Sequence, residues 1–233
     1  MNVVLAVLLS LIISTFIGFL NGIIIAELRM PALIVTFASQ TIFAGYAYII
    51  CGGVPISRMP ESFLKLGQGY VGPIPVPVIV MVVIFAIGTF ILNKTYFGRY
   101  FYALGGNEEA ALLSGIKIKV VKCLVYSLSG LFAGIAGLVM LARANTAQPN
   151  AGVGYEFDVI TCVVLGGVSV NGGSGKMSNV IAGVLIIGVL SNGMVLMNIS
   201  SYMQMVIKGI ILLLAVGADC IQQMNLQKTK AIA

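Results

Sequence analysis

Seven apolar segments alternate with short polar stretches along the chain. They cover residues 3–26, 32–50, 74–92, 123–142, 156–168, 178–197 and 203–219. All but the fifth are 17 to 24 residues long, enough for a helix to cross about 30 Å of hydrocarbon. The pattern predicts an all-α membrane protein, a polytopic helical bundle with about seven hydrophobic segments.

The fifth segment, EFDVITCVVLGGV, has only thirteen residues and runs into the glycine-rich VNGGSGKMSN. Its length predicts a discontinuous element, a half-helix followed by irregular backbone. Such backbone is stable at membrane depth only where protein or a water-filled cavity surrounds it.

Composition supports lipid as the solvent, since 59% of the residues are hydrophobic and 9% are charged. The mean hydropathy of +1.08 is too high for a soluble domain of this length. Residues 1–233 are therefore expected to form a single transmembrane domain. The first apolar run lacks a basic flank and a cleavage site, so it is predicted to be a span.

Lysine and arginine positions predict the orientation. With the loop 93–122 in the cytoplasm, nine basic residues lie inside and three outside, with Lys208 inside a span. If the fifth segment did not cross, the count would be six against six. The net charge of +6 thus follows from topology, and no nucleic acid is implied. Met1 falls outside, which an odd number of preceding spans would resolve, so the sequence is expected either to be a fragment or to carry a misassigned start.

Two segments next to spans have more than one interpretation. The external loop 51–73 contains PESFLKL, a short amphipathic stretch that either packs over the bundle or docks an external partner. The cluster of aromatic and basic residues from Lys94 to Tyr102 is typical of an interfacial belt, and stacking on a ligand is the alternative.

Several kinds of chemistry are poorly supported by the residues present. The chain has no histidine, which excludes a Ser–His pair and a HExxH zinc site. The stretch LGGVSVNGGSGKMS departs from a phosphate-binding loop, with Val170 where glycine is needed and Met177 where Ser or Thr is needed. We expect no metal and no other cofactor. The glycines here, and the pair Gly130 and Gly134, predict close helix packing and a tight turn.

A few polar residues are candidates for a solute pathway. Glu156 and Asp158 lie two positions apart, so a helix would turn them to different faces; they either complement the helix N-terminus or line a pathway mouth. Lys208 either reaches the interface or pairs inside the bundle. Asn192 either bonds another helix or contacts solute. The pathway candidates are Asn145, Gln148, Asn150, Glu156, Asp158 and Asn192.

The stretch GGNEEAALLSGIKIKVVK, residues 105–122, is unusually polar for this chain. Asn107 is a good N-cap, Glu108 and Glu109 complement the positive helix end, and Gly115 suits the position after the helix. A helix over 108–114, about 10 Å long, is predicted. Such a helix either lies on the surface or enters a groove of a partner.

Three long motifs, in order, resemble the sugar-type ABC importer permeases, a family that includes ribose, autoinducer-2, xylose and galactose permeases. They are GRYFYALGGNEEAALLSGIKIKVVK, LARANTAQPNAGVGYEFDVITCVVLGGVSVNGGSGK and SNGMVLMNISSYMQMVIKGIILLLAV. The resemblance implies a helix that couples to a cytoplasmic ABC ATPase, formed here by Asn107, Glu108, Glu109, Ala110, Ala111, Ser114 and Gly115. It also implies a second permease chain and an extracytoplasmic solute-binding protein.

The function expected from this resemblance is that of a permease subunit in the bacterial cytoplasmic membrane. It would move a sugar-like solute with ATP hydrolysed by the partner, and would not itself be an enzyme. An ATP-independent carrier or channel is the first alternative, but it would have no use for the coupling helix. An intramembrane enzyme is the second, and the absent histidine and the lack of converging acids argue against it.

Overall fold

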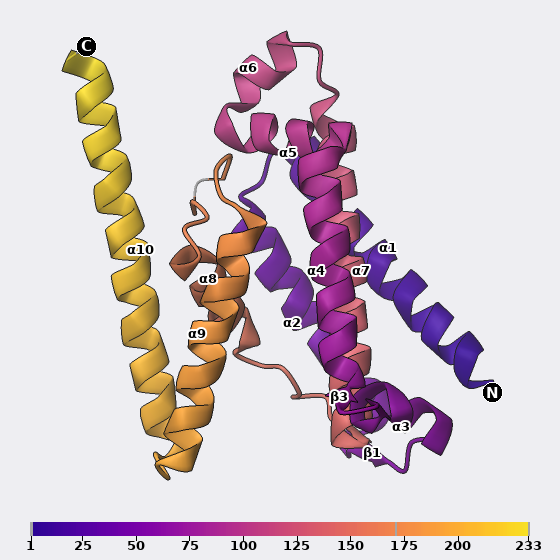
Figure 1. Cartoon of the computed structure of the whole chain (residues 1–233). Helices are drawn as coiled ribbons and strands as arrows, with labels where there is room; N and C mark the ends of the chain where they lie inside the picture. The colour runs from indigo at the N-terminus through magenta and orange to yellow at the C-terminus, as the bar shows by residue number, and fades with distance from the viewer. Residues whose placement is uncertain (1, 171, 233) are drawn as a thin grey trace. The chain divides into compact units, whose positions relative to one another are not determined.

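The computed structural model describes residues 2–170 and 172–232, with side chains to Ile221. The elements, in chain order, are shown in Figure 1. They are α1 (Val3–Leu28), α2 (Ala32–Cys51), β1 (Ile56–Ser57), α3 (Glu61–Gln68), β2 (Tyr70–Val71), β3 (Ile74–Pro75), α4 (Val76–Lys94), α5 (Tyr96–Gly106), α6 (Glu108–Leu113), α7 (Ile118–Ala144), β4 (Thr146–Ala147), α8 (Tyr155–Leu165), α9 (Met177–Leu196) and α10 (Ser201–Ile232).

Within the described residues, six helices are long and apolar enough to cross a membrane. They are α1, α2, α4, α7, α9 and the Ser201–Ile221 part of α10, each matching a predicted segment. The predicted all-α polytopic fold is confirmed. α7 begins at Ile118, earlier than the apolar run, and Lys119 and Lys122 in its first turns pair with the carboxylates of Glu27 and Glu108.

The chain divides into two compact units. The first contains the described residues up to Phe101 and then Glu108–Ala151. The second contains Tyr102–Asn107 and the described residues from Gly152 onward. The last turns of α5 therefore belong to the second unit, whereas α6, which follows at once in the chain, belongs to the first.

Small residues bring α1 and α7 together in the first unit. A Cβ on Gly130 would overlap the carbonyl oxygen of Ser14, and one on Gly134 would overlap the Ser14 side chain. A Cβ on Gly18 would lie 3.1 Å from the Cα of Gly130. The prediction that Gly130 and Gly134 serve packing is thus confirmed, while Gly137 faces open space.

The loop between α2 and α4 packs on the end of α7. PESFLKL forms α3, whose Phe63 is buried, and a Cβ on Gly67 would overlap the backbone of Arg143. Gln68 Nε2 donates a hydrogen bond to the Arg143 carbonyl at 3.1 Å. β1 pairs antiparallel with β4, and β2 with β3. The loop is therefore a packed connector, and its use as a docking surface stays a prediction.

The second unit contains the short helix α8. Its eleven residues span about 16 Å, roughly half the hydrocarbon. The described residues that follow, 166–170 and 172–176, have no regular structure. They contain four glycines with positive φ, which allow the tight turn: Gly167 (+72°), Gly172 (+88°), Gly173 (+71°) and Gly175 (+147°). The predicted half-helix followed by irregular backbone is confirmed.

Candidate functional site

The charged stretch forms α6, ending one residue before the predicted boundary. Gly115 has φ +81°. Its N–H donates to the Leu112 carbonyl at 3.0 Å, and the Ile116 N–H donates to the Ala111 carbonyl at 3.1 Å. These two bonds form a Schellman motif, in which glycine adopts the left-handed conformation that ends a helix. The position predicted for Gly115, directly after the helix, is confirmed; its part in coupling to an ATPase stays a prediction.

A lysine of α7 holds the first turn of α6. Lys122 Nζ donates to both carboxylate oxygens of Glu108, at 2.7 and 2.9 Å. The Glu108 side chain remains half exposed, whereas that of Lys122 is mostly covered. Fourteen residues separate the pair, and nothing in the sequence indicated it. α6 is thus fixed at its start by an ion pair and at its end by Gly115.

The N-terminal side of α6 connects directly to α5. The Asn107 N–H donates to the Ala103 carbonyl at 3.1 Å, so the helical hydrogen bonding of α5 continues to the residue before α6. Asn107 lies at the predicted cap position, and the capping bond of its side chain stays a prediction. Glu109 is exposed in the first turn of α6.

Side-chain exposure divides the residues of α6. Ala111 is only 3% exposed, so its side chain supports the helix against its own unit. Ala110 and Ser114 are exposed, and their contact with an ATPase stays a prediction. Leu112 and Leu113 are also exposed, Leu113 to 89%. These two leucines were missed by the sequence analysis, although two adjacent leucines in a polar stretch are the signal that would have found them.

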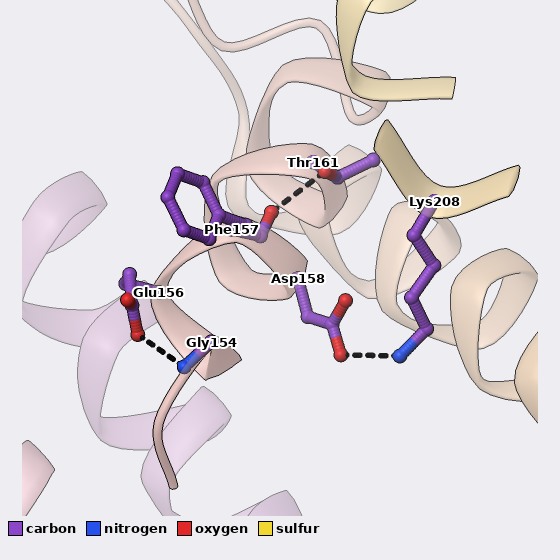
Figure 2. Close-up of polar contacts among 6 residues, drawn as sticks. All are labelled: Gly154, Glu156, Phe157, Asp158, Thr161 and Lys208. Carbon is purple, nitrogen blue, oxygen red and sulfur yellow. Dashed lines mark hydrogen bonds and ion pairs between the residues drawn. The ribbon is translucent and has the colours of Figure 1, made fainter. Parts of the chain in front are cut away.

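The second polar cluster lies at the start of α8 (Figure 2). Lys208 Nζ of α10 lies 2.6 Å from Asp158 Oδ2, and the two side chains are 27% and 28% exposed. Of the two roles considered for Lys208, the structure shows pairing. A charge-assisted bond at this distance joins the first turn of α8 to α10.

Glu156 turns away from Asp158, as predicted from their spacing (Figure 2). Its Oε2 accepts a hydrogen bond from the Gly154 N–H at 3.0 Å, at the start of α8. Thr161 Oγ1 donates to the Phe157 carbonyl one turn earlier, at 2.6 Å. The two acids therefore do not converge on a common point. Glu156 accepts from the Gly154 N–H, and Asp158 pairs with Lys208 of α10.

The remaining pathway candidates lie in different surroundings. Asn145 adopts φ +54° at the end of α7, and its Oδ1 accepts from the Met59 N–H at 3.1 Å. This bond gives Asn145 a structural role in joining α7 to the loop 51–73. Gln148 and Asn150 are exposed after β4 in the first unit, and Asn192 is exposed on α9 in the second. Their contact with solute stays a prediction.

Residues 1–216 match the family described as the branched-chain amino acid transport system / permease component. The chain belongs to this permease family. It is 46% identical over 218 residues to the ribose import permease protein of Bacillus subtilis, covering 93% of this chain and 68% of that one. It is 43% identical to the ribose import permease protein of Haemophilus influenzae over 213 residues, 90% and 66% of the two chains.

A third relative is the L-arabinose transport system permease protein of Escherichia coli K12. It is 45% identical over 203 residues, covering 87% of this chain and 62% of that protein. The chain spans about two thirds of the length of these curated relatives. No solved structure matches it.

These findings confirm the family predicted from the three motifs, that of sugar-type ABC importer permeases. Together with the six apolar helices, they identify a multi-pass protein of the bacterial inner membrane. It is a transport subunit and not an enzyme. Permeases of ABC importers work with an ATPase and a binding protein in general.

Proposed function

We propose that this chain carries a sugar across the inner membrane, driven by ATP that a cytoplasmic ABC ATPase hydrolyses. Relatives 41–46% identical are ribose and L-arabinose permeases, which supports a sugar as the solute. An external binding protein delivers the sugar, and a second permease chain completes the pathway.

The observation that supports the proposal most directly is that α6 is held at both ends but exposes an apolar side chain. An ion pair and a Schellman motif fix this short helix at its two ends, yet it exposes Leu113 almost completely. A leucine left in water gains free energy, about 1.5–3 kcal/mol for full burial, when a partner covers it. We propose that the ATPase receives α6 in a groove, with Leu112 and Leu113 as apolar contacts and Glu109, Ala110 and Ser114 beside them.

The test is uptake into vesicles that contain the chain, the ATPase of the same organism's import system and the matching binding protein. Radiolabelled ribose and L-arabinose are the probes. We expect accumulation of at least one sugar that requires both ATP and the binding protein. Uptake that persists without ATP would instead establish a passive carrier or channel. A chain that never associates with an ATPase would remove the role proposed for α6.

A further inference from the structure

Residues 102–107 pack against the loop that follows α8. The Tyr102 hydroxyl donates a hydrogen bond to the Gly175 carbonyl at 3.0 Å. Beside it, a Cβ on Gly105 would overlap the backbone nitrogen of Gly173. We call this contact the glycine clasp; it comprises Tyr102, Gly105, Gly172, Gly173 and Gly175. All of these residues belong to the second unit.

The clasp brings two backbones into direct contact. A Cβ on Gly173 would lie 2.5 Å from the Cα of Gly106, and one on Gly172 would lie 3.3 Å from the Cα of Gly105. Gly172 and Gly173 also have positive φ, which other residues rarely adopt. Since no flexible side chain separates the backbones, a displacement of residues 102–107 toward the loop must move the loop as well.

The loop itself is short and internally hydrogen-bonded. The Ser169 N–H donates to the Ser174 carbonyl at 3.1 Å, and the Gly172 N–H donates to the Ser169 carbonyl at 3.0 Å. The Val168 N–H donates back to the Val163 carbonyl of α8 at 3.1 Å. These hydrogen bonds close the loop into a turn and join it to the last turn of α8.

α8 is in turn held by both neighbouring helices. A Cβ on Gly166 would lie 2.8 Å from the Asn179 carbonyl oxygen of α9, and one on Gly183 of α9 would overlap the Cys162 carbonyl. The Asp158–Lys208 pair joins α8 to α10. The clasp thus contacts a continuous body made of α8, its loop and the helices packed on it.

The clasp residue segment 102–107 is joined to α6 directly by the chain. The Asn107 N–H bonds to the Ala103 carbonyl, and α6 begins at the next residue, Glu108. We propose that the glycine clasp transmits the displacement of α6 to α8, with Tyr102, Gly105 and Gly173 as positioning residues for transport. This inference rests on the proposed docking of an ATPase on α6.

Two glycine variants open the clasp, and each has a matched control. Gly173→Ala introduces a Cβ at φ +71° that overlaps the Gly106 backbone, whereas Gly167→Ala introduces one at φ +72° with no atom within 4 Å. The difference between them isolates the clasp from backbone strain. Gly105→Ala overlaps Gly173, while Gly106→Ala meets nothing within 4 Å.

A third variant, Tyr102→Phe, removes only the hydrogen bond to Gly175 and adds no bulk. It keeps the proposal testable if the glycine variants fail to fold. Membrane expression and gel filtration in detergent check that each variant folds correctly.

The readout is the reactivity of Cys162, a buried native cysteine on α8. Cys51, Cys123 and Cys220 are replaced by alanine, and the full chain is reconstituted with its ATPase and binding protein. N-ethylmaleimide labels Cys162 with and without ATP and vanadate. We expect the nucleotide to change the labelling rate of the parent by about fivefold or more, the lower range of coupling between sites.

Gly173→Ala and Gly105→Ala are expected to remove this change while the ATPase still co-purifies and hydrolyses ATP, and Tyr102→Phe is expected to reduce it. The two control variants should keep it. Such uncoupling is not explained by a merely structural role, because the ATPase remains bound and active. If the clasp variants respond like the parent, or if Cys162 of the parent is insensitive to nucleotide, the clasp does not transmit motion. If instead no ATPase binds the parent, the failure lies with the proposed function.

Discussion

At the scale of single residues, Lys122 holds α6 in place, because its Nζ donates to both carboxylate oxygens of Glu108. Because the Glu108 side chain is half exposed, the pair contributes only about 0.2–1 kcal/mol to stability. Its importance is the position of α6, since the carboxylate that complements the helix N-terminus also joins α6 to α7.

A charge exchange tests that pair. Glu108→Lys places two ammonium groups together and puts positive charge at the positive helix end, so α6 should separate from α7. We expect ATPase co-purification to fall about fivefold or more, equivalent to roughly 1 kcal/mol. Glu108→Lys combined with Lys122→Glu restores the attraction and should recover part of the loss. Equal losses of ATPase co-purification in the single and double variants would show that the ATPase contacts the Glu108 carboxylate itself.

The Asp158–Lys208 pair is less exposed, and the expected effect of its loss is larger. Lys208→Met keeps the length of the side chain but leaves Asp158 without its partner. We expect the free energy of unfolding of the variant to be about 1–3 kcal/mol lower. This is less than the roughly 3–5 kcal/mol lost when a fully buried pair is broken. Melting in detergent measures the effect, and adding Asp158→Asn should return most of the stability. An unchanged melting temperature for Lys208→Met would contradict a stabilising pair.

At the scale of elements, α6 illustrates how exposure divides one helix into a supporting face and an open face. Ala111 is buried in its own unit, so a large replacement there disturbs α6 directly and does not report on a partner. Leu113 makes the better test because it is almost fully exposed.

Leu113→Asp should weaken ATPase association by placing a charge in the apolar contact, and should leave expression and melting unchanged. The matched control is Val54→Asp, at a residue that is 64% exposed beyond the end of α2. A loss of about tenfold or more in ATPase affinity for the first variant alone is expected, because an unpaired charge in an apolar contact costs more than 1.4 kcal/mol. Equal ATPase affinity in both variants would remove Leu113 from the contact.

At the scale of the whole molecule, the chain order and the clasp bear on topology. The clasp places residues 172–175 on the same side as residues 102–107. In the first unit, β4 pairs with β1, so residues 146–147 lie with the loop 51–73 at the C-terminal end of α7. The crossing by the fifth segment and the nine-to-three distribution of basic residues stay predictions.

Cysteine labelling on intact cells tests the predicted orientation. A membrane-impermeant maleimide should label Cys51 from outside and should reach Cys220 only after the cells are opened. Lys176→Cys, in a chain without other cysteines, should likewise be labelled only after the cells are opened if the fifth segment crosses. Labelling of Lys176→Cys in intact cells would favour the six-to-six arrangement.

The sequence alone determined the spans, the short fifth segment and the end of α6 at Gly115. These features depend on residues close together in the chain, because the length of an apolar run and a glycine at a helix end act locally. The glycine packing between α1 and α7 was predicted as a type of contact, and the structure supplied its partners, Ser14 and Gly18.

Only the tertiary structure decided which polar groups meet. Lys208 could reach the interface or pair, and the choice depended on Asp158, fifty residues away in the chain. Tyr102 matched an interfacial belt until its bond to Gly175, 73 residues distant, became visible. The burial of Ala111 and the exposure of Leu113 were likewise set by how α6 lies against its unit. A local pattern fixes what a segment can form, whereas the partner of a charge or hydroxyl depends on distant residues that folding brings within a few ångströms.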